Sequence, residues 1–201
     1  MNNINLKGII KDIQPSHTID NISFDKAKLI CKRTNGREDI INLRFKSFTN
    51  NYEENSEIEL KGNIRSYSYK VTEDKNKVTI YVFTYFDRPE LEDEDVTNQA
   101  QLDGRICKIN PLRTTKNGRQ NIHLILANNI ICENSSKRLN TYVPCIAWGK
   151  IAKELSELSV NTKLNVYGEL HSREHKKVHE NGEIEIRVAH EFLITSYEVI
   201  Q

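Results

Sequence analysis

The sequence predicts an all-β fold of two tandem five-stranded barrels, with one short helix in each. The first observation behind this prediction is an internal repeat. The motif at Leu6–Ile13 returns at Leu102–Ile109, and the motif at Ile58–Ile64 returns at Leu164–Leu170. Repeat units of about 100 residues are domains rather than solenoid turns. Each copy is also long enough to bury a core of its own.

The second observation is an alternation of apolar and polar residues with a period of two, which is typical of half-buried strands. Ile122–Leu126 shows it in the second copy, and Val78–Phe83 has the same strand-like character in the first. Helical spacing of apolar residues predicts a helix over Lys150–Leu158. The matching stretch, Lys46–Glu57, is shorter and rich in asparagine, so we expect a degenerate helix or a turn there. The order of three strands, a helix and two strands is that of the OB-fold.

Charge divides the chain between the two copies. Residues 1–86 and 96–201 each carry 14 Lys/Arg and 11 Asp/Glu, whereas residues 87–95 carry one base and six acids. An acidic, proline-containing run that cannot bury itself is typical of a solvated linker. We therefore expect a first domain at 1–86, an acidic linker at 87–98 and a second domain at 99–201. The near-neutral total then conceals two mildly basic domains.

The segment Tyr142–Ala152 is the most specific in the chain, because a strand ends in Trp148 and Gly-Lys then enters an amphipathic helix. It resembles the third strand and helix of bacterial single-stranded DNA-binding proteins. Val166–His175 resembles the next strand of that family, and Leu102–Arg105 resembles its first strand. The resemblance covers Gln101–Tyr197 in the right order. It implies an OB-fold that binds single-stranded DNA without catalysis.

Flat aromatic faces for the bases and cations along the backbone are what sequence-independent binding requires. The resemblance places Trp148 and Tyr142 on two of the family's stacking positions and His175 on a third. A fourth falls on Ile130, which cannot stack. The candidate phosphate contacts that interleave with these rings are Arg105, Lys116, Arg119, Lys150 and Arg173.

The first domain repeats this arrangement in a degenerate form. Superposing the two copies places Phe45 on Trp148, Lys46 near Lys150 and Tyr69 on His175. The candidate groove of the first domain then consists of Arg44, Phe45, Lys46, Tyr67 and Tyr69. A packing or dimerisation role for this domain stays open. Tyr81 and Phe83 lie in a strand with alternating residues, and by default we expect such aromatic side chains to be buried in the core.

Other chemistry is disfavoured. No P-loop, Ser/His/Asp order or paired carboxylate occurs in a suitable context, so we expect no catalytic residues, no cofactor and no enzyme activity. His171, His175 and His179 recur every fourth residue, but a hairpin segment gives such spacing no shared ligand face, and we expect no metal site. The cysteines form no C-x-x-C pair. No run of about 18 apolar residues and no signal peptide occurs, so a cytoplasmic location is expected.

The sequence therefore predicts a tandem OB-fold protein that binds single-stranded DNA in replication, recombination or repair. The alternative is an OB-fold protein-interaction or assembly module with weak or no nucleic-acid binding. RNA is not excluded as a ligand, because stacking faces do not distinguish the sugars. The family commonly assembles four OB-folds, so the resemblance suggests a homodimer, although a monomer using both grooves stays open. The end at Glu198–Gln201 leads us to expect no acidic recruitment tail.

Overall fold

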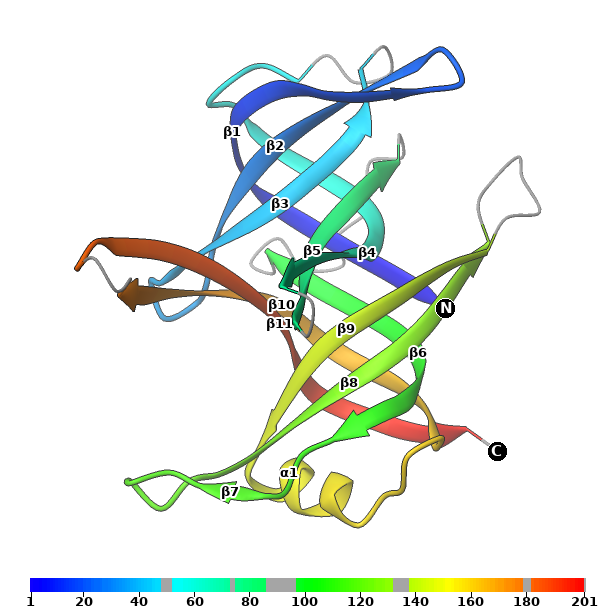
Figure 1. The fold of residues 1–201 in the computed structure, drawn as a ribbon, viewed down its shortest axis with the longest axis vertical. Helices are drawn as coiled ribbons and strands as arrows, with labels where there is room; N and C mark the ends of the chain where they lie inside the picture. The colour runs from blue at the N-terminus through cyan, green and yellow to red at the C-terminus, as the bar shows by residue number, and fades with distance from the viewer. Residues whose placement is uncertain (48–51, 73–74, 86–96, 132–137, 179–181, 201) are drawn as a thin grey trace.

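The computed structural model describes residues 1–47, 52–72, 75–85, 97–131, 138–178 and 182–200 (Figure 1). The predicted acidic linker falls almost entirely on residues 86–96, which lie outside the described residues. Strand β6 begins at Asn98, one residue before the predicted start of the second domain. The first half of the chain contains β1 (Asn2–Ile19), β2 (Ile22–Lys32), β3 (Glu38–Lys46), β4 (Glu57–Thr72) and β5 (Lys75–Tyr85).

The second half of the chain adds the one helix found among the described residues and six further strands. A two-residue strand, β7, accompanies the start of β8 as a small hairpin. The elements are β6 (Asn98–Ile109), β7 (Arg113–Thr114), β8 (Gln120–Ile131), β9 (Arg138–Trp148), α1 (Gly149–Ser156), β10 (Lys163–Val178) and β11 (Ile184–Ile200).

Strand pairing bends each half into a five-stranded ring. The order β2-β3-β5-β4-β1 is closed by a pairing of β1 with β2, and β6-β10-β11-β9-β8 is closed by a pairing of β6 with β8. In each ring one parallel pairing covers only two residue pairs, between β3 and β5 and between β9 and β11. The rings are therefore partial barrels with the strand order of the OB-fold. This confirms the fold class predicted from the sequence.

Each barrel buries the inward-facing residues of its strands, and the buried residues of both barrels form one hydrophobic cluster. In β1 every second residue from Asn2 to Ile10 is buried, including Ile4 and Leu6. In the second barrel Val166 and Phe192 are fully buried. Because successive side chains of a strand point to opposite faces, the residues between them are left for the outer face. That outer face carries the candidate site.

The repeated glycines stand where two strands of a barrel approach most closely. A Cβ atom on Gly62 would collide with the carbonyl oxygen of Phe83, and one on Gly168 would collide with that of Leu193. Any side chain at either position would push β4 from β5, or β10 from β11. The repeat therefore preserves a steric requirement of the barrel.

The helix is shorter than predicted. It ends at Ser156 and packs Ala152 and Leu155 into the second barrel. In the first barrel the residues that precede β4 form a turn, with Asn55 in the left-handed region at φ 66°. Residues 48–51 lie outside the described residues. Among the described residues, the prediction of one short helix in each barrel therefore holds for the second barrel only, and the alternative of a turn holds for the first.

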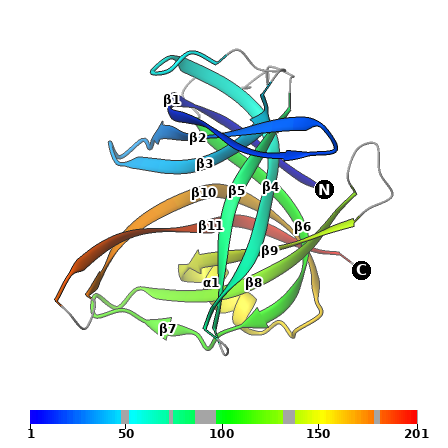
Figure 2. The same cartoon turned by 45° about the horizontal axis from the view of Figure 1, so that its top comes forward.

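The two barrels are joined by an antiparallel pairing of β1 with β6, with Asn2 opposite Leu102, Ile4 opposite Ala100 and Leu6 opposite Asn98. The repeat equates Leu6 with Leu102 and Asn2 with Asn98. Exchanging the two barrels therefore returns the same set of pairs, which is the property of an isologous interface. One chain thus contains an approximate two-fold axis through the pair of Ile4 and Ala100. Figures 1 and 2 show the barrels on opposite sides of this shared sheet.

Candidate nucleic-acid interface

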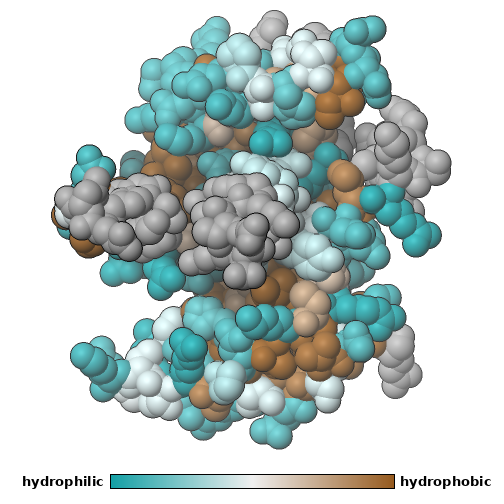
Figure 3. All heavy atoms as spheres, viewed as in Figure 1, coloured by the Kyte–Doolittle hydropathy of each residue, from teal (hydrophilic) through white to brown (hydrophobic). Residues whose placement is uncertain are grey.

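A groove of about 850 Å³ opens on the outer face of the second barrel. It lies between the β7–β8 hairpin on one side and the projecting β10–β11 hairpin on the other (Figure 2), and a hollow between these hairpins is visible at the left of Figure 3. The floor includes Ile146 and Trp148 of β9 and Leu193 of β11. Hydrophilic side chains cover most of the molecule in the view of Figure 3.

Trp148 is half-buried at the end of β9, on the strand face opposite the core residues Val143, Cys145 and Ala147. Its backbone pairs with Asn121 of β8. The guanidinium of Arg119 lies over the indole ring, 5.2 Å from its centroid. A guanidinium beside an indole ring places a cation and a stacking surface together, which suits a base and its phosphate. Trp148 therefore lies where the sequence places it.

The β7–β8 hairpin that carries Arg119 is shaped by a tight turn. The Thr115 N–H donates to the Arg119 carbonyl over 2.8 Å, and the Gly118 N–H donates to the Thr115 carbonyl over 2.9 Å. Gly118 has φ 75°, a left-handed conformation that glycine adopts without strain. Lys116 is exposed in this turn. The Asn-Gly pair thus sets the position of the basic hairpin beside Trp148.

Charge in the groove is mixed but mainly positive. The charged side chains of its lining are Arg33, Arg37, Arg113, Arg119 and Arg173 against Glu38, Glu174 and Glu191. A neighbouring recess of about 420 Å³ shares Arg113 and Arg173 and adds Lys108. Arg33 is paired with Asp39, so four arginines against three glutamates leave a small excess of positive charge along the path past Trp148. Such an excess attracts a phosphate backbone in a salt-dependent way.

Three of the predicted cations of the second domain lie away from the lining of this groove. Arg105 is exposed on β6 and donates to the Asn161 carbonyl over 3.0 Å. Lys150 is exposed in the first turn of α1 and lies 3.6 Å from Glu154. Lys116 extends from the hairpin turn. Of the predicted cations, Arg119 and Arg173 line the groove.

Tyr142 is also placed differently from the prediction. Its side chain is 41% exposed, but it does not line the groove of Trp148. Its N–H donates instead to the Ser66 hydroxyl of β4 over 2.8 Å, so it lies where the second barrel meets the first. Ile130 is 9% exposed and belongs to the buried residues of the second barrel. For His175 and Tyr69 the structure describes only the backbone, which pairs with Arg187 and Lys77.

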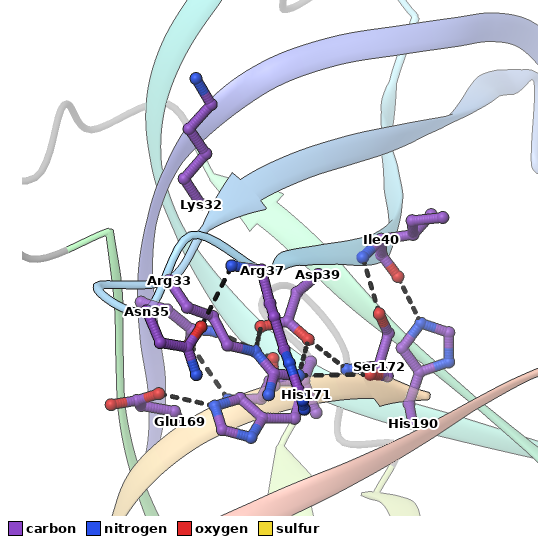
Figure 4. A network of polar contacts seen from close by, with 12 residues as sticks. Lys32, Arg33, Asn35, Arg37, Asp39, Ile40, Glu169, His171, Ser172 and His190 are labelled. Carbon is purple, nitrogen blue, oxygen red and sulfur yellow. Dashed lines mark hydrogen bonds and ion pairs between the residues drawn. The ribbon is translucent and has the colours of Figure 1, made fainter. Parts of the chain in front are cut away.

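On one side of the junction between the two barrels, a polar network joins Arg33, Asp39, Ile40, Ser172 and His190 (Figure 4). Asp39 is 1% exposed. It accepts two hydrogen bonds from Arg33, of 2.6 and 2.5 Å, and one from the Ser172 N–H. A buried carboxylate that accepts three such bonds is fully compensated. The ion pair with Asp39 raises the pKa of Arg33.

Ser172 and Ser66 occupy equivalent places in this junction. The Ile40 N–H donates to the Ser172 hydroxyl over 2.8 Å, just as the Tyr142 N–H donates to the Ser66 hydroxyl. Ile40 makes a second contact with the other barrel, because its carbonyl oxygen lies 2.7 Å from the Nε2 of His190. Burial lowers the pKa of His190, so the neutral ring donates Nε2–H to that carbonyl.

The first barrel carries a smaller pocket on the equivalent face, with a volume of about 290 Å³. The Arg44 guanidinium lies 4.8 Å from the ring centroid of Tyr67 and 4.5 Å from that of Tyr81. Lys26 and Lys28 line the same pocket. Arg44 and Tyr67 therefore meet as predicted, but the rings already contact a cation of their own chain.

A second aromatic group of the first barrel shares strands β4 and β5 with this pocket and includes residues of β1 and β2. Arg65 lies 3.9 Å from the ring centroid of Phe83. Phe24 stacks on His17 with a centroid distance of 4.9 Å and lies 6.1 Å from Phe83. Tyr81 and Phe83 thus face outward, and the core positions of β5 belong to its aliphatic residues. The default interpretation of this strand was wrong for these two rings.

Phe45 is not a stacking residue, contrary to the prediction. It is 1% exposed and packs edge-on against Tyr52 at 5.1 Å. The strand register gives the reason, since Lys46 pairs with Phe24 as Trp148 pairs with Asn121. Lys46, rather than Phe45, is therefore the equivalent of Trp148. Superposition of the sequences alone was off by one residue, and one residue exchanges the faces of a strand.

Sequence reasoning missed the roles of Arg33, Arg37, Phe24, Tyr81 and Phe83. The sequence did carry a signal that Tyr81 and Phe83 face outward, because they alternate with the aliphatic residues Ile80 and Val82. In the structure Ile80 and Val82 take the core positions and are 2% and 0% exposed. No signal along the chain placed Arg33 and Arg37 beside the other barrel, because that contact depends on the pairing of β1 with β6.

Two further expectations concern metals and membranes. Within the described ranges no cluster of three or more His, Cys, Asp or Glu is placed to hold a metal ion. The Nε2 of His171 contacts the Glu169 carboxylate at 2.6 Å. The side chains of His175 and His179 lie outside the described residues. No described helix has the length and apolar character to span a membrane.

Comparison with known proteins identifies the class to which this geometry belongs. Residues 98–180 match the model of a family described as "another single-strand binding protein family". No curated protein matches the sequence. The crystal structure of the wild-type single-stranded DNA binding protein from Thermus aquaticus is similar over 100% of this chain and 93% of its own, with 19% identity and a TM-score of 0.72. A deletion mutant of that protein gives 19% identity, 100% and 95% coverage and a TM-score of 0.71.

The resemblance predicted from the sequence is thus confirmed. The segment from 98 to 180 matches the model of a single-strand binding protein family, and the whole chain has the fold of the Thermus aquaticus protein. That protein is described as a single-stranded DNA binding protein.

Proposed function

We propose that this protein binds single-stranded DNA, largely without reading its sequence, as a non-catalytic component of replication, recombination or repair in the cytoplasm. The observation that carries the proposal is the groove on the outer face of the second barrel, in which Trp148 lies beneath Arg119 among further arginines. The family match over residues 98–180 and the fold of the Thermus aquaticus protein support the same ligand.

Two kinds of contact would hold the strand. A base stacked on the exposed part of Trp148 contributes about 1–3 kcal/mol, irrespective of which base it is. Arg113, Arg119 and Arg173 line the groove at positions from which they can neutralise successive phosphates. Each neutralised phosphate releases counterions, so the affinity falls as salt is added. Neither contact reads a base edge, which accounts for the absence of sequence preference.

We further propose that the chain consists of two OB domains, at 1–86 and 99–201, which share the work unequally. In the first domain Arg44, Tyr67 and Lys46 would contribute weaker contacts, because the pocket on that face, of about 290 Å³, is smaller than the groove of about 850 Å³ on the second barrel. The same observation favours a second candidate function for that domain, a protein-interaction or assembly module. Of the remaining predicted contacts, Tyr142, Lys116, Lys150 and Arg105 would be peripheral, and Tyr69 and His175 stay predictions.

Assembly and ligand class extend the proposal. The internal two-fold axis already pairs two barrels in one chain, so a homodimer would present four OB-folds and a monomer two. RNA would bind through the same stacking contacts unless a 2′-hydroxyl group were excluded by the groove.

Electrophoretic mobility shift tests the proposal. A labelled oligo(dT) should be retarded by the full chain at low salt, oligo(dC) should behave similarly, and a duplex of equal length should compete poorly. Retardation of the duplex and of the single strand alike would indicate nonspecific charge attraction. No retardation of any single strand would favour the assembly module.

A further inference from the structure

One wall of the groove that holds Trp148 comes from the other barrel. The turn between β2 and β3 of the first barrel reaches across the junction, and Arg33, Arg37 and Glu38 line the groove together with residues of β9 and β10. Figure 4 shows this turn above β10, with Arg33 directed toward Ser172. The second barrel therefore does not enclose its groove alone.

The turn is held firmly in place. Arg33 is tied to the buried carboxylate of Asp39, and Asp39 accepts a hydrogen bond from the Ser172 N–H. The Ile40 N–H donates to the Ser172 hydroxyl, and His190 contacts the Ile40 carbonyl from β11. These contacts use backbone groups of β3 and β10, so the position of the turn is set by both strands. Arg33 is consequently a structural cation, with its charge compensated by Asp39.

Arg37 differs from Arg33 in this respect. Its side chain is exposed, and across the described residues its guanidinium forms no ion pair. Its backbone is nevertheless fixed, because the Arg37 N–H donates to the Asn35 side chain over 3.1 Å. An exposed guanidinium on an ordered turn is available to a phosphate, and binding then orders the side chain but not the backbone.

The opposite groove receives no such cation. The junction is approximately two-fold, with Ile40 and Tyr142 as equivalent donors to the two serines. Counting back three residues from each donor makes Leu139 the equivalent of Arg37. Leu139 is 39% exposed and carries no charge. The described lining of the pocket with Tyr67 comes from the first barrel alone, whereas Arg37 of the first barrel adds positive charge to the groove with Trp148.

We propose that the nucleic-acid groove of the second barrel is composite, and that Arg37 of the first barrel contacts a phosphate of the strand stacked on Trp148. This inference rests on the proposed function. It makes the first barrel a contributor to binding even if its own face binds nothing.

Trp148 is the only tryptophan of the chain, so its fluorescence reports on this groove alone. The full chain would be titrated with an oligo(dT) of about 10 nucleotides, close to the site of a single OB-fold, at several salt concentrations. Arg37→Ala is compared with Lys32→Ala, which removes the same charge from an exposed position of β2. In Figure 4 Lys32 points away from the junction.

Arg37→Ala should reduce the slope of log K against log salt by about 0.7, the value for one phosphate contact with a single strand. That loss corresponds to an affinity about fivefold lower at 0.1 M salt. Lys32→Ala should leave the slope unchanged, and Arg37→Lys should restore most of it. Glu38→Gln removes an acid from the same wall and should raise the affinity.

The outcomes separate this inference from the function on which it rests. If the unmodified chain is quenched by oligo(dT) while Arg37→Ala and Lys32→Ala both behave like it, the composite groove is wrong and the proposed function stands. If both variants lose slope equally, the effect is general charge attraction and the inference also fails. Absence of quenching in the unmodified chain overturns both proposals.

Discussion

Asn2 and Asn98 make the same pair of hydrogen bonds in the two barrels. The Asn2 amide donates to the Ile64 carbonyl and accepts from the Ile64 N–H, both over 2.8 Å. The Asn98 amide donates to the Leu170 carbonyl over 2.8 Å and accepts from the Leu170 N–H over 3.1 Å. Each amide thus bonds to the N–H and the carbonyl of one residue, as a neighbouring strand would, in β4 for Asn2 and in β10 for Asn98. Both asparagines are 7% exposed.

These asparagines anchor the two ends of the β1–β6 pairing to their own barrels, because Asn2 bonds to β4 and Asn98 bonds to β10. An amide side chain carries an acceptor and a donor side by side, so it can satisfy a buried carbonyl and a buried N–H together. Loss of either amide would leave two backbone groups, those of Ile64 or of Leu170, without these partners, at a cost of about 1–3 kcal/mol each.

Asn98→Ala should lower the free energy of unfolding by about 1–3 kcal/mol for each group of Leu170 left unpaired. Urea unfolding followed by circular dichroism measures this change. The control is Gln99→Ala, which removes an exposed amide from the next position of β6 and should alter stability by less than about 0.5 kcal/mol. Equal effects of the two substitutions would show that the Asn98 contacts do not stabilise the fold.

The register of β3 gives a paired prediction for the first barrel. Phe45→Ala removes a fully buried ring and should destabilise the protein by about 3–5 kcal/mol. Tyr67→Ala truncates a ring that is 41% exposed, so it should cost little stability and should weaken oligo(dT) binding if this face contributes. Thermal unfolding and a gel shift distinguish the two. A stable Phe45→Ala protein with impaired binding would restore Phe45 as a stacking residue.

Trp148 allows stacking to be separated from folding. Trp148→Ala should weaken binding by about 1–3 kcal/mol while leaving a folded protein, because the ring lies on the outer face of β9. Trp148→Phe keeps a π-face and should retain most of the affinity. Anisotropy of a labelled oligo(dT) measures both variants, since the substitution removes the intrinsic fluorophore. An unfolded Trp148→Ala protein would instead identify the ring as part of the core.

His190 predicts how stability depends on pH. Burial at the junction lowers the pKa of His190 below its ordinary value of about 6.5. In the window between the two values the unfolded chain binds the additional proton, so unfolding becomes easier as pH falls below about 6.5. Stability should therefore drop between pH 7.5 and pH 5.5 in urea unfolding. The drop should be smaller in His190→Gln than in the control His123→Gln, and equal drops would contradict the assignment.

The strand order, the helix of the second barrel and the place of Trp148 at the end of a strand could all be predicted from the sequence. Period-two alternation and the internal repeat depend on local structure, so they indicate it directly. Phe45 shows where this fails. An internal repeat with a shorter loop in one copy can be superposed one residue out of register, and a strand then exchanges its buried and exposed faces. The expected burial of Tyr81 and Phe83 was wrong for another reason, because aliphatic residues of the same strand occupy the core positions.

The placement of Arg37 and Tyr142 could not be predicted from either copy alone. Arg37 directly precedes β3 and Tyr142 lies within β9, and each lies beside the other barrel. That placement follows from the two-fold pairing of β1 with β6, which joins residues about 100 positions apart in the chain. Local sequence patterns carry no information at that range.

The measurement that tests the central claim most directly is the fluorescence of Trp148 during addition of poly(dT) at increasing salt. The account predicts that poly(dT) quenches this fluorescence and that log K falls linearly with log salt, by about 0.7 for each phosphate contacted. A fluorescence that does not change at low salt, in a protein that is fully folded, would show that no strand stacks on Trp148.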